Sequence, residues 1–477
     1  MKPAPARSLW LRDALSRPGE EDRPPLRART RADVCIVGGG YTGLWTALRL
    51  KELAPSLDVV LVEADVCGGG ASGRNGGMVL SWWAKFPTLR KSFGTEEALR
   101  LARASADAVA AVGEECRRLG IDAEYRRDGY LWVATNEAQV GSWQAVMREL
   151  EQAGERCFVE WTPEEVAART GSGVHTGGVF EASGAVVQPA LLARGLRRAA
   201  LERGVRVFER SPMRALRRMP GAWSVETIAG AVQSDRVVVA TNAWAVRFRE
   251  VRRHIMVLGS DIVATPRIPD RLADLGWADG LGVSDSRLLV HYYRTTEDGR
   301  LVFGKGGGAL AGAGRVGSAF EGTSRRAGEV TRQFRRTYPA LEDVPIEMSW
   351  TGPVERTRSG LPYFAPLDRR EGVLVGVGYS GNGVGPSYLG GRVLASLALG
   401  RDDEWSRSGL AGGPNGRFPP APLRWVGGTI VRAAIARKED REDRGRPVGA
   451  LNRRLVELAP AGLVSTKGRA PQERRPS

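Results

Sequence analysis

Apolar residues form their first continuous run at 32–37, a length typical of a buried strand. The glycines at 38–43 interrupt this run, and leucine and alanine then recur at helical spacing until Pro55. A second apolar run at 58–62 predicts another buried strand. The ordered part of the chain therefore begins with a strand, a glycine turn, a helix and a strand, which is the pattern of a β-α-β unit.

Later segments alternate between helical spacing and short apolar runs. We predict helices at 95–119, 136–153, 189–203, 324–338 and 386–399. We predict strands at 130–134, 205–208, 237–240, 254–265, 288–294, 300–304 and 372–378. The β-α-β start, the strand-rich middle and the final strand, turn and helix predict an α/β and α+β fold with two interleaved domains.

The two ends of the chain depart from this pattern. Residues 1–31 are rich in Pro and Arg without clear periodicity, which predicts an N-terminal arm. Residues 401–477 form a basic extension with one amphipathic helix at about 423–437. Such a helix either docks on its own protein or lies on a membrane surface, and docking is the commoner outcome.

Composition and charge change this picture little. The chain has 477 residues of which 42% are hydrophobic, enough for a large core, and this excludes a disordered protein. It has no apolar run long enough to cross a membrane and no N-terminal signal core, so we expect a cytoplasmic protein. The net charge of +16 is of the sign found in nucleic-acid-binding proteins, but its excess lies in the two ends. We therefore expect no nucleic-acid partner.

Cysteine and histidine are too few and too scattered for a structural role. The four cysteines lie in the first third of the chain and include no C-x-x-C pair, which argues against a disulfide framework. The three histidines are far apart in the sequence, and no zinc-binding spacing is present. We therefore predict a reducing environment and no metal site.

The glycine turn after the first strand carries a dinucleotide-binding fingerprint. Gly38, Gly40 and Gly43 have the G-x-G-x-x-G spacing, and Glu63 follows at the end of the second strand. Gly38 permits the tight turn, Gly40 lets a pyrophosphate approach the helix N-terminus, and Gly43 lets the helix pack on the strand. Glu63 can accept hydrogen bonds from ribose hydroxyls and would repel a 2′-phosphate, which disfavours NADP. The alternative is that these glycines form only a tight turn.

Two further glycine-rich segments distinguish FAD from NAD. The first, 68–77, lets backbone pass close to a flat ligand and adds the polar side chains of Ser72, Arg74 and Asn75, although a flexible surface loop would have a similar composition. The second, 378–385, lies between a buried strand and a helix. A helix N-terminus there can stabilise the negative charge of a reduced flavin. A long ligand that reaches from the first turn to the last favours FAD.

Together these three segments resemble the FAD-dependent oxidoreductases of the D-amino-acid oxidase superfamily. The glycine oxidase and sarcosine oxidase branch is the most similar, and segment 71–77 is most like the γ-glutamylputrescine oxidase-like proteins. Further matches occur in the family's order at 187–189, 204–207, 240–244, 292–294, 303–304, 350–352 and 360–362. The resemblance implies a Rossmann-like FAD-binding domain (about 32–90, 189–250 and 350–400) interleaved with a mixed-sheet substrate domain (about 91–188 and 251–349).

The resemblance also implies which residues contact FAD. They are Gly38, Gly40, Thr42, Gly43, Glu63, Ala64, Ala71, Ser72, Arg74, Asn75, Gly76, Gly77, Met213, Ala240, Thr241, Tyr379, Ser380, Gly381, Asn382, Gly383 and Val384. Some members of the family bind FAD covalently through Cys or His. This chain has no Cys after Cys157 and no His within 68–77, so we expect non-covalent FAD.

The implied reaction is oxidation of the C–N bond of a small amine or amino acid. A hydride passes to flavin N5, the imine is hydrolysed, and the electrons go to O2, which gives H2O2, or to another acceptor. Because the cofactor carries the redox chemistry, the protein needs no nucleophilic side chain. Two alternatives remain, namely an FAD-dependent enzyme that acts on modified tRNA and a non-catalytic nucleotide-binding module.

Six residues are candidates for the substrate side, namely Tyr292, Tyr293, Arg294, Lys305, Trp350 and Arg356. Aromatic rings can wall a pocket and an arginine can bind a carboxylate, while Lys305 could activate oxygen. We predict catalytic roles for Tyr293, Lys305, Trp350 and Arg356. Each has a structural alternative, because alternate residues of a half-buried strand face the core and strand charges often face solvent.

Overall fold

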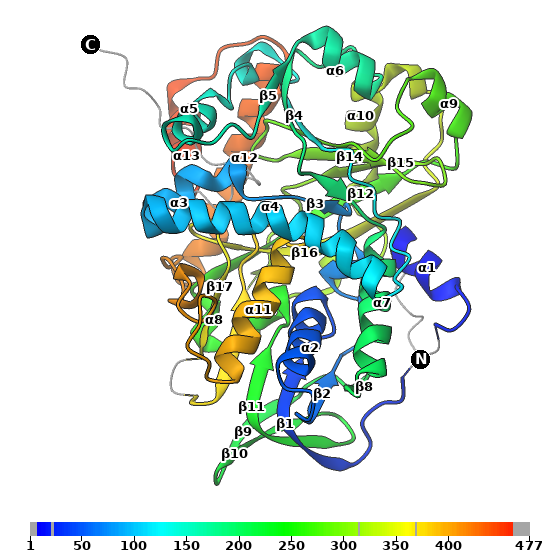
Figure 1. Ribbon diagram of the computed structural model, residues 1–477. Coiled ribbons are helices and arrows are strands. Elements are labelled where there is room, and N and C mark those ends of the chain that lie inside the picture. Colours follow the sequence, from blue (N-terminus) through cyan, green and yellow to red (C-terminus); the bar gives the residue numbers. More distant parts are fainter. Residues whose placement is uncertain (1–6, 21–22, 313–314, 368–369, 461–477) are drawn as a thin grey trace.

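The computed structural model describes residues 7–20, 23–312, 315–367 and 370–460 (Figure 1). Two large sheets lie one above the other in the view of Figure 1, and helices cover their outer faces. The first sheet has the order β17-β18-β11-β1-β2-β8, and β10 and β9 extend from β11. Its strands are β1 (Arg29–Val37), β2 (Val59–Val62), β8 (Arg206–Phe208), β9 (Ala215–Met219), β10 (Ala222–Glu226), β11 (Ala231–Val239), β17 (Tyr363–Pro366) and β18 (Val373–Val377).

The centre of this sheet is the predicted β-α-β unit. β1 and β2 pair in parallel, and the crossover helix α2 (Tyr41–Leu53) joins them in the chain. On the other side of β1, β11 and then β18 continue the parallel sheet. All four residues of β2 are buried, as expected for a parallel strand with both faces covered. The carboxyl ends of these parallel strands meet at one edge, which is where ligands bind in such sheets.

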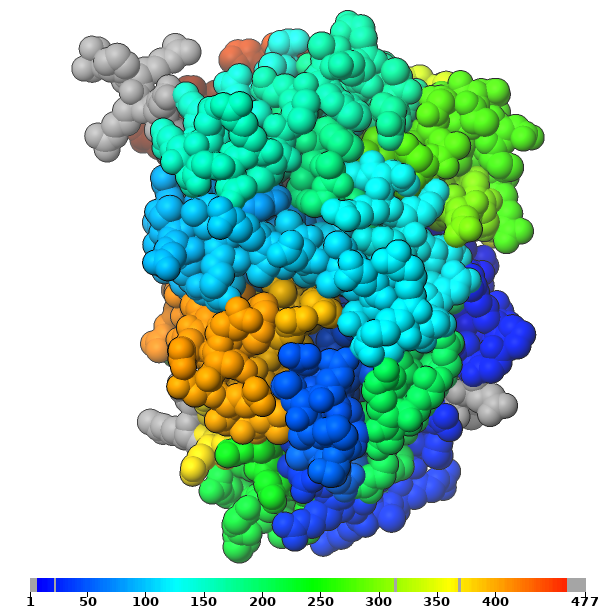
Figure 2. All heavy atoms as spheres, viewed as in Figure 1, coloured from blue at the N-terminus to red at the C-terminus, as the bar shows by residue number. Residues whose placement is uncertain are grey.

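Helices close the first sheet on the face seen in Figures 1 and 2. In Figure 2, α4 (Thr95–Arg118, cyan) lies above the ends of α11 (Pro386–Ala398, orange), α2 (blue) and α7 (Pro189–Glu202, green). The helices α2 and α11 pack so closely that a Cβ at Gly391 would lie 2.6 Å from the Cβ of Trp45. The helices α2 and α11, more than 300 residues apart in the chain, thus belong to one layer. The strand, turn and helix pattern at the end of the family-like region predicted such an interleaved arrangement.

The second sheet has the order β16-β12-β15-β14-β13-β4-β6-β5. Its strands are β4 (Tyr130–Val133), β5 (Val159–Trp161), β6 (Gly178–Glu181), β12 (Ile255–Ala264), β13 (Gly282–Asp285), β14 (His291–Thr295), β15 (Leu301–Lys305) and β16 (Met348–Thr357). Most neighbours are antiparallel, and β13 with β4 is parallel, so the sheet is mixed. Because β16 pairs with β12, we propose that the FAD-binding part begins after Thr357 and not at 350.

Several shorter elements lie between these strands in the chain. They are α3 (Phe86–Phe93), α5 (Gln144–Gln152), α6 (Pro163–Thr170), α8 (Arg249–Arg252), α9 (Pro269–Asp274), α10 (Ala327–Thr337) and the small pair β3 (Met78–Val79) and β7 (Ala185–Val186). The helix α6 begins with a capping box between Thr162 and Glu165, a start signal that its sequence contains. α10 packs Val330 and Phe334 onto the second sheet, because its apolar residues recur four positions apart.

Residues 7–20 pack on the body of the protein and contain a helix, whereas we expected an arm over residues 1–31. α1 (Leu9–Ser16) is capped by the hydroxyl of Ser8 and buries Leu9, Trp10, Leu11 and Ala14. Trp10 meets Trp350 of β16 edge to face, with ring centroids 5.9 Å apart. Eight residues are too few for a clear period, which explains why the pattern alone did not predict this helix.

The described part of the C-terminal extension, residues 401–460, also packs on the body of the protein. α12 (Leu423–Asp443) is longer than predicted and is followed by α13 (Ala450–Glu457). Ala434 and Ile435 of α12 pack against Leu289. The carboxylate of Asp443, at the end of α12, forms an ion pair with the buried Arg287 at 2.7 Å. The first turns of α12 leave large apolar side chains exposed, namely Leu423, Trp425, Val426 and Ile430. No helix among the described residues is long and apolar enough to cross a membrane.

Candidate active site

A cavity of about 670 Å³ lies at the carboxyl edge of the first sheet, against β14 and β16 of the second. It is lined by every residue predicted to contact FAD except Gly43 and Gly77. Gly43 lies behind the cavity, where a Cβ would approach the carbonyl oxygen of Gly38 to 2.0 Å, so it permits the helix to pack on the turn. Gly77 has φ +77°, and a Cβ there would lie 2.2 Å from the carbonyl oxygen of Val187.

One end of the cavity is the turn from β1 to α2. Gly38 has φ +114°, and a Cβ there would meet the carbonyl oxygen of Ala240 at 2.5 Å. Gly40 offers no side chain to cap the helix, and the hydroxyl of Ser72 accepts a hydrogen bond from the Tyr41 N–H at 3.0 Å. The start of the helix therefore presents N–H groups to the cavity without a bulky side chain, a geometry suited to phosphate.

Glu63 stands at the end of β2, beside this turn. Its carboxylate accepts hydrogen bonds from the N–H groups of Gly39 at 2.7 Å and Asp65 at 2.9 Å. Burial raises the pKa of Glu63, and these two N–H groups lower it. The remaining lone pairs of a carboxylate so fixed can accept hydrogen bonds from the hydroxyls of a ribose.

The turn after β18 lines the same cavity. The hydroxyl of Tyr379 lies 2.8 Å from the hydroxyl of Thr42, which joins this turn to the first helix across 337 residues of sequence. Gly378, Ser380 and Gly381 all have positive φ, and α11 begins shortly after them. The first and last glycine-rich segments therefore belong to one site, as their resemblance to the family implied.

Glu355 on β16 is a cavity residue that sequence analysis missed. It is 2% exposed, and its Oε1 accepts hydrogen bonds from the N–H groups of Gly378 at 3.1 Å and Tyr379 at 3.0 Å. Burial raises the pKa of Glu355, while the backbone donors and the side chain of Asn242 lower it. The one available signal was a carboxylate within a strand-length segment whose only other charge is Arg356.

The wall formed by the second sheet carries Tyr292 and Arg356. The ring of Tyr292 lies over Gly76, where a Cβ would approach it to 2.9 Å, and its hydroxyl lies 2.8 Å from that of Ser260. Arg356 is 7% exposed, and burial lowers its pKa to about 10, although nearby Glu355 raises it. A buried guanidinium that faces a cavity can bind a carboxylate of a ligand.

The other candidates for the substrate side lie outside this cavity. Tyr293 points to the opposite face of β14, where its hydroxyl lies 2.6 Å from Nε2 of His175. The Nζ of Lys305 lies 3.0 Å from Nε2 of His291, in a buried polar cluster. Trp350 donates from Nε1 to the carbonyl oxygen of Arg74 at 2.9 Å, and Arg294 donates to that of Val187 at 2.7 Å. Of the four catalytic predictions, only Arg356 lines the cavity, and Tyr292 takes the place of Tyr293.

The polar lining of the cavity fits a bound cofactor. The hydroxyl of Thr241 and the side-chain oxygen of Asn382 are buried without a hydrogen-bond partner among the described residues, and both residues line the cavity. Such atoms are rare in folded proteins unless a ligand or water binds them. None of the lining residues is Cys or His, which suits a cofactor held without a covalent bond.

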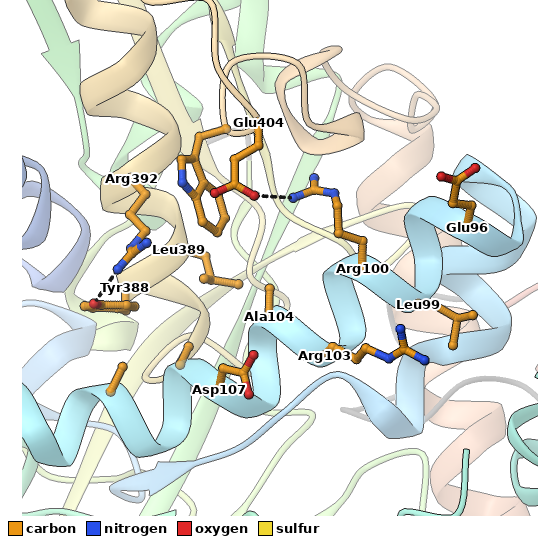
Figure 3. Close-up of a pocket in the computed structure, with 13 residues that line it drawn as sticks. Glu96, Leu99, Arg100, Arg103, Ala104, Asp107, Tyr388, Leu389, Arg392 and Glu404 are labelled. Carbon is orange, nitrogen blue, oxygen red and sulfur yellow. Dashed lines mark hydrogen bonds and ion pairs between the residues drawn. The ribbon is translucent and has the colours of Figure 1, made fainter. Parts of the chain in front are cut away.

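A second hollow of about 550 Å³ lies on the surface between α4 and α11 (Figure 3). Its arginines are occupied by neighbouring side chains: Arg100 pairs with Glu97 at 2.6 Å, and Arg392 donates to the hydroxyl of Tyr388 at 2.9 Å. Trp405 covers one side, with Arg392 at 5.3 Å from its ring. This hollow has no glycine in its lining and contains none of the predicted site residues.

The described residues contain no group of three or more His, Cys, Asp or Glu side chains placed to hold a metal ion.

Comparison with known proteins agrees with the interpretation of the large cavity as a cofactor site. A family model described as FAD dependent oxidoreductase (DAO) matches residues 33–397.

Individual relatives match over most of the chain. The chain is 32% identical over 416 residues to gamma-glutamylputrescine oxidoreductase of Escherichia coli (strain K12), covering 86% of this chain and 93% of that protein. It is 29% identical over 390 residues to the probable oxidoreductase OrdL of Haemophilus influenzae, covering 80% and 86%. The solved structure of glycine oxidase from Geobacillus kaustophilus superposes with a TM-score of 0.65 at 21% identity, covering 81% of this chain and 99% of that one. The predicted fold class is therefore confirmed.

Proposed function

Because this chain belongs to the family of FAD-dependent oxidoreductases that act on amines and amino acids, we propose that it oxidises a C–N bond of an amine that also carries a carboxylate. The observation that carries this proposal is the single cavity that joins the dinucleotide turn, the last glycine turn and the buried Arg356. FAD is the cofactor of the family, and it supplies a hydride acceptor when bound.

We place the adenosine end of FAD beside Glu63 and its pyrophosphate at the start of α2. The N–H groups at that helix start favour the negative charge of phosphate, and Ser72 fixes the loop against them. Met213, Ala240 and Thr241 line the cavity next to this end. We place the flavin ring against the turn at 379–384, which lines the same cavity. We propose that FAD is held without a covalent bond, a proposal supported by a described lining that contains neither Cys nor His.

The substrate would lie between Tyr292 and Arg356, on the side of the cavity formed by the second sheet. The guanidinium of Arg356 would bind the carboxylate and so orient the amine-bearing carbon. The ring of Tyr292 would exclude water from the reacting carbon. The substrate loses two electrons and two protons as its amine becomes an imine, and water then converts the imine to a carbonyl compound and a free amine. The electrons pass to O2, which yields H2O2, or to another acceptor.

The E. coli relative is named for γ-glutamylputrescine, so γ-glutamylated amines belong in the first substrate panel. Purified protein is expected to be yellow and to release free FAD when denatured. Anaerobic addition of each amine should then bleach the flavin only with true substrates. A colourless protein that does not take up added FAD, or a flavin that no carboxylated amine bleaches, would overturn the proposal.

A further inference from the structure

A single buried carboxylate, in the lining of the cavity, joins three segments of the chain. Glu355 lies near the end of β16, and its Oε1 receives the N–H groups of Gly378 and Tyr379 from the turn after β18. The side chain of Asn242, from the turn after β11, also donates to this carboxylate. β16 belongs to the second sheet, whereas β11 and β18 belong to the first, so Glu355 connects the two sheets at the site.

The turn that Glu355 holds has an unfavourable backbone conformation. Gly378 has φ +98°, Ser380 has φ +56° and Gly381 has φ +91°. A left-handed conformation at a non-glycine residue such as Ser380 persists only when its surroundings hold it. The hydroxyl of Ser380 accepts a hydrogen bond from the Thr357 N–H at 3.1 Å and donates to the carbonyl oxygen of Gly378 at 3.0 Å. Glu355 and Ser380 together fix both ends of the turn.

The hydrogen bonds of Glu355 favour its ionised form and oppose the effect of burial, which raises its pKa. Its hydrogen-bond partners Gly378, Tyr379 and Asn242 all donate N–H groups, and an ionised carboxylate has acceptors only, so it can satisfy all three. Two buried basic side chains, Arg356 and Lys85, interact with it electrostatically. The Nζ of Lys85 donates to the carbonyl oxygen of Gly360 at 2.6 Å, in the loop that leaves β16.

We propose that Glu355 is a positioning residue with a second, electrostatic role: it holds the Gly378–Gly381 turn against the flavin, and its charge keeps the reduction potential of FAD low. The proposal rests on the proposed function, because it requires the flavin ring to lie at this turn. A flavin gains negative charge on reduction, and a fixed negative charge nearby opposes that gain. The low dielectric of a buried site strengthens this effect.

The two roles can be separated by two conservative substitutions. Glu355→Gln keeps an acceptor oxygen for both N–H groups and removes the charge. We expect this variant to retain FAD, to have a more positive midpoint potential and to bind sulfite, which adds negative charge to the flavin, about tenfold more tightly. A tenfold change in the two-electron equilibrium corresponds to about 30 mV.

Glu355→Asp keeps the charge and shortens the side chain. We expect it to retain a potential close to that of the unaltered protein and to bind FAD more weakly, as measured by fluorescence titration of the apoprotein. Glu404→Gln, on the rim of the second hollow, is the control for charge removal and should change neither quantity. Equal potentials in the Gln variant and the unaltered holoprotein, or equal effects of Gln and Asp, would overturn the inference. A colourless unaltered protein would instead refute the proposed function.

Discussion

The large cavity and the hollow between α4 and α11 have similar volumes, about 670 and 550 Å³, but differ in how their polar groups are satisfied. In the cavity, carboxylates such as Glu63 and Glu355 bind backbone N–H groups of glycine turns. In the hollow, Arg100 of α4 pairs with Glu404 from the turn after α11, and Arg392 of α11 donates to the hydroxyl of Tyr388 (Figure 3). Volume alone therefore does not distinguish a binding site from a surface groove.

The difference has a physical basis in the cost of burying charge. Arg356 and Glu355 are almost fully buried, and such groups destabilise a fold unless each has a partner. Arg100 and Glu404 remain about a third or more exposed, and solvent-exposed pairs of this kind contribute little. Buried charged side chains around a cavity are therefore better explained by the binding of a ligand than by a contribution to stability. The following predictions test this contrast.

The largest effect is expected at Arg356. Arg356→Met should lower kcat/KM for a carboxylated amine by about 100- to 1000-fold, because the loss of a buried charge-assisted contact costs about 3–4 kcal/mol. FAD content should stay the same. Steady-state kinetics with the best substrate of the panel would measure this, and Arg392→Met in the hollow is the matched control. An equal loss in both variants would remove the distinction between the two regions.

The next effect concerns the cofactor itself. Glu63→Ala removes the carboxylate at the ribose position and leaves the N–H groups of Gly39 and Asp65 without their acceptor. We expect FAD to bind about 10- to 100-fold more weakly. Fluorescence titration of the apoprotein with FAD gives the dissociation constant. Unchanged affinity would exclude Glu63 from the ribose role, and Glu404→Ala should leave the constant unaltered.

A smaller effect is expected from Lys85 as pH changes. Burial and the nearby Arg356 lower the pKa of Lys85 from 10.5 to about 7, while Glu355 raises it. Between these two values the unfolded chain binds the proton and the folded chain does not, so this residue makes stability rise with pH by at most about 1.4 kcal/mol per unit. Lys85→Met should flatten the pH dependence of the free energy of unfolding above pH 7. An unchanged slope would show that Lys85 keeps its proton.

The smallest effect is expected in the hollow. Arg100→Ala breaks the pairs with Glu97 and Glu404, and we expect a change in the free energy of unfolding within about 0.5 kcal/mol. Chemical denaturation at low and high salt would measure it, and the difference should shrink further at high salt. Flavin content and kcat/KM should not change. A large loss of activity would show that this hollow belongs to the active site.

Sequence patterns predicted the site where glycine spacing and strand order carry the information. Gly38, Gly40 and Tyr379 line the same cavity because a parallel sheet brings the carboxyl ends of its strands to one edge. Patterns could not decide which of two neighbouring tyrosines faces the cavity, since alternation in β14 shows two faces but not which one is covered. Tyr292 faces the cavity and Tyr293 packs beside Phe303.

Glu355 and α1 escaped prediction for a different reason. Their roles depend on partners distant in sequence: Glu355 binds the turn after β18, and Trp10 donates from Nε1 to the carbonyl oxygen of Asn75 at 2.9 Å. A single sequence shows local periodicity, whereas such contacts are defined only by the folded topology. The sequence therefore predicted which residues line the cavity. It did not predict the contacts that hold this lining in place, such as those of Glu355 and Trp10.

The packing of α12 on the second sheet has a consequence for the order in which the protein matures. Leu289 donates its N–H to the carboxylate of Glu439, 150 residues later in the chain, and Asp443 pairs with Arg287. Because a chain emerges from the ribosome N-terminus first, Arg287 pairs with Asp285 of β13 before the acids of α12 are synthesised. A translation product that stops before α12 would lack the second ion pair of Arg287 and the hydrogen bond at Leu289, and we expect it to be less stable and more readily degraded than the full chain.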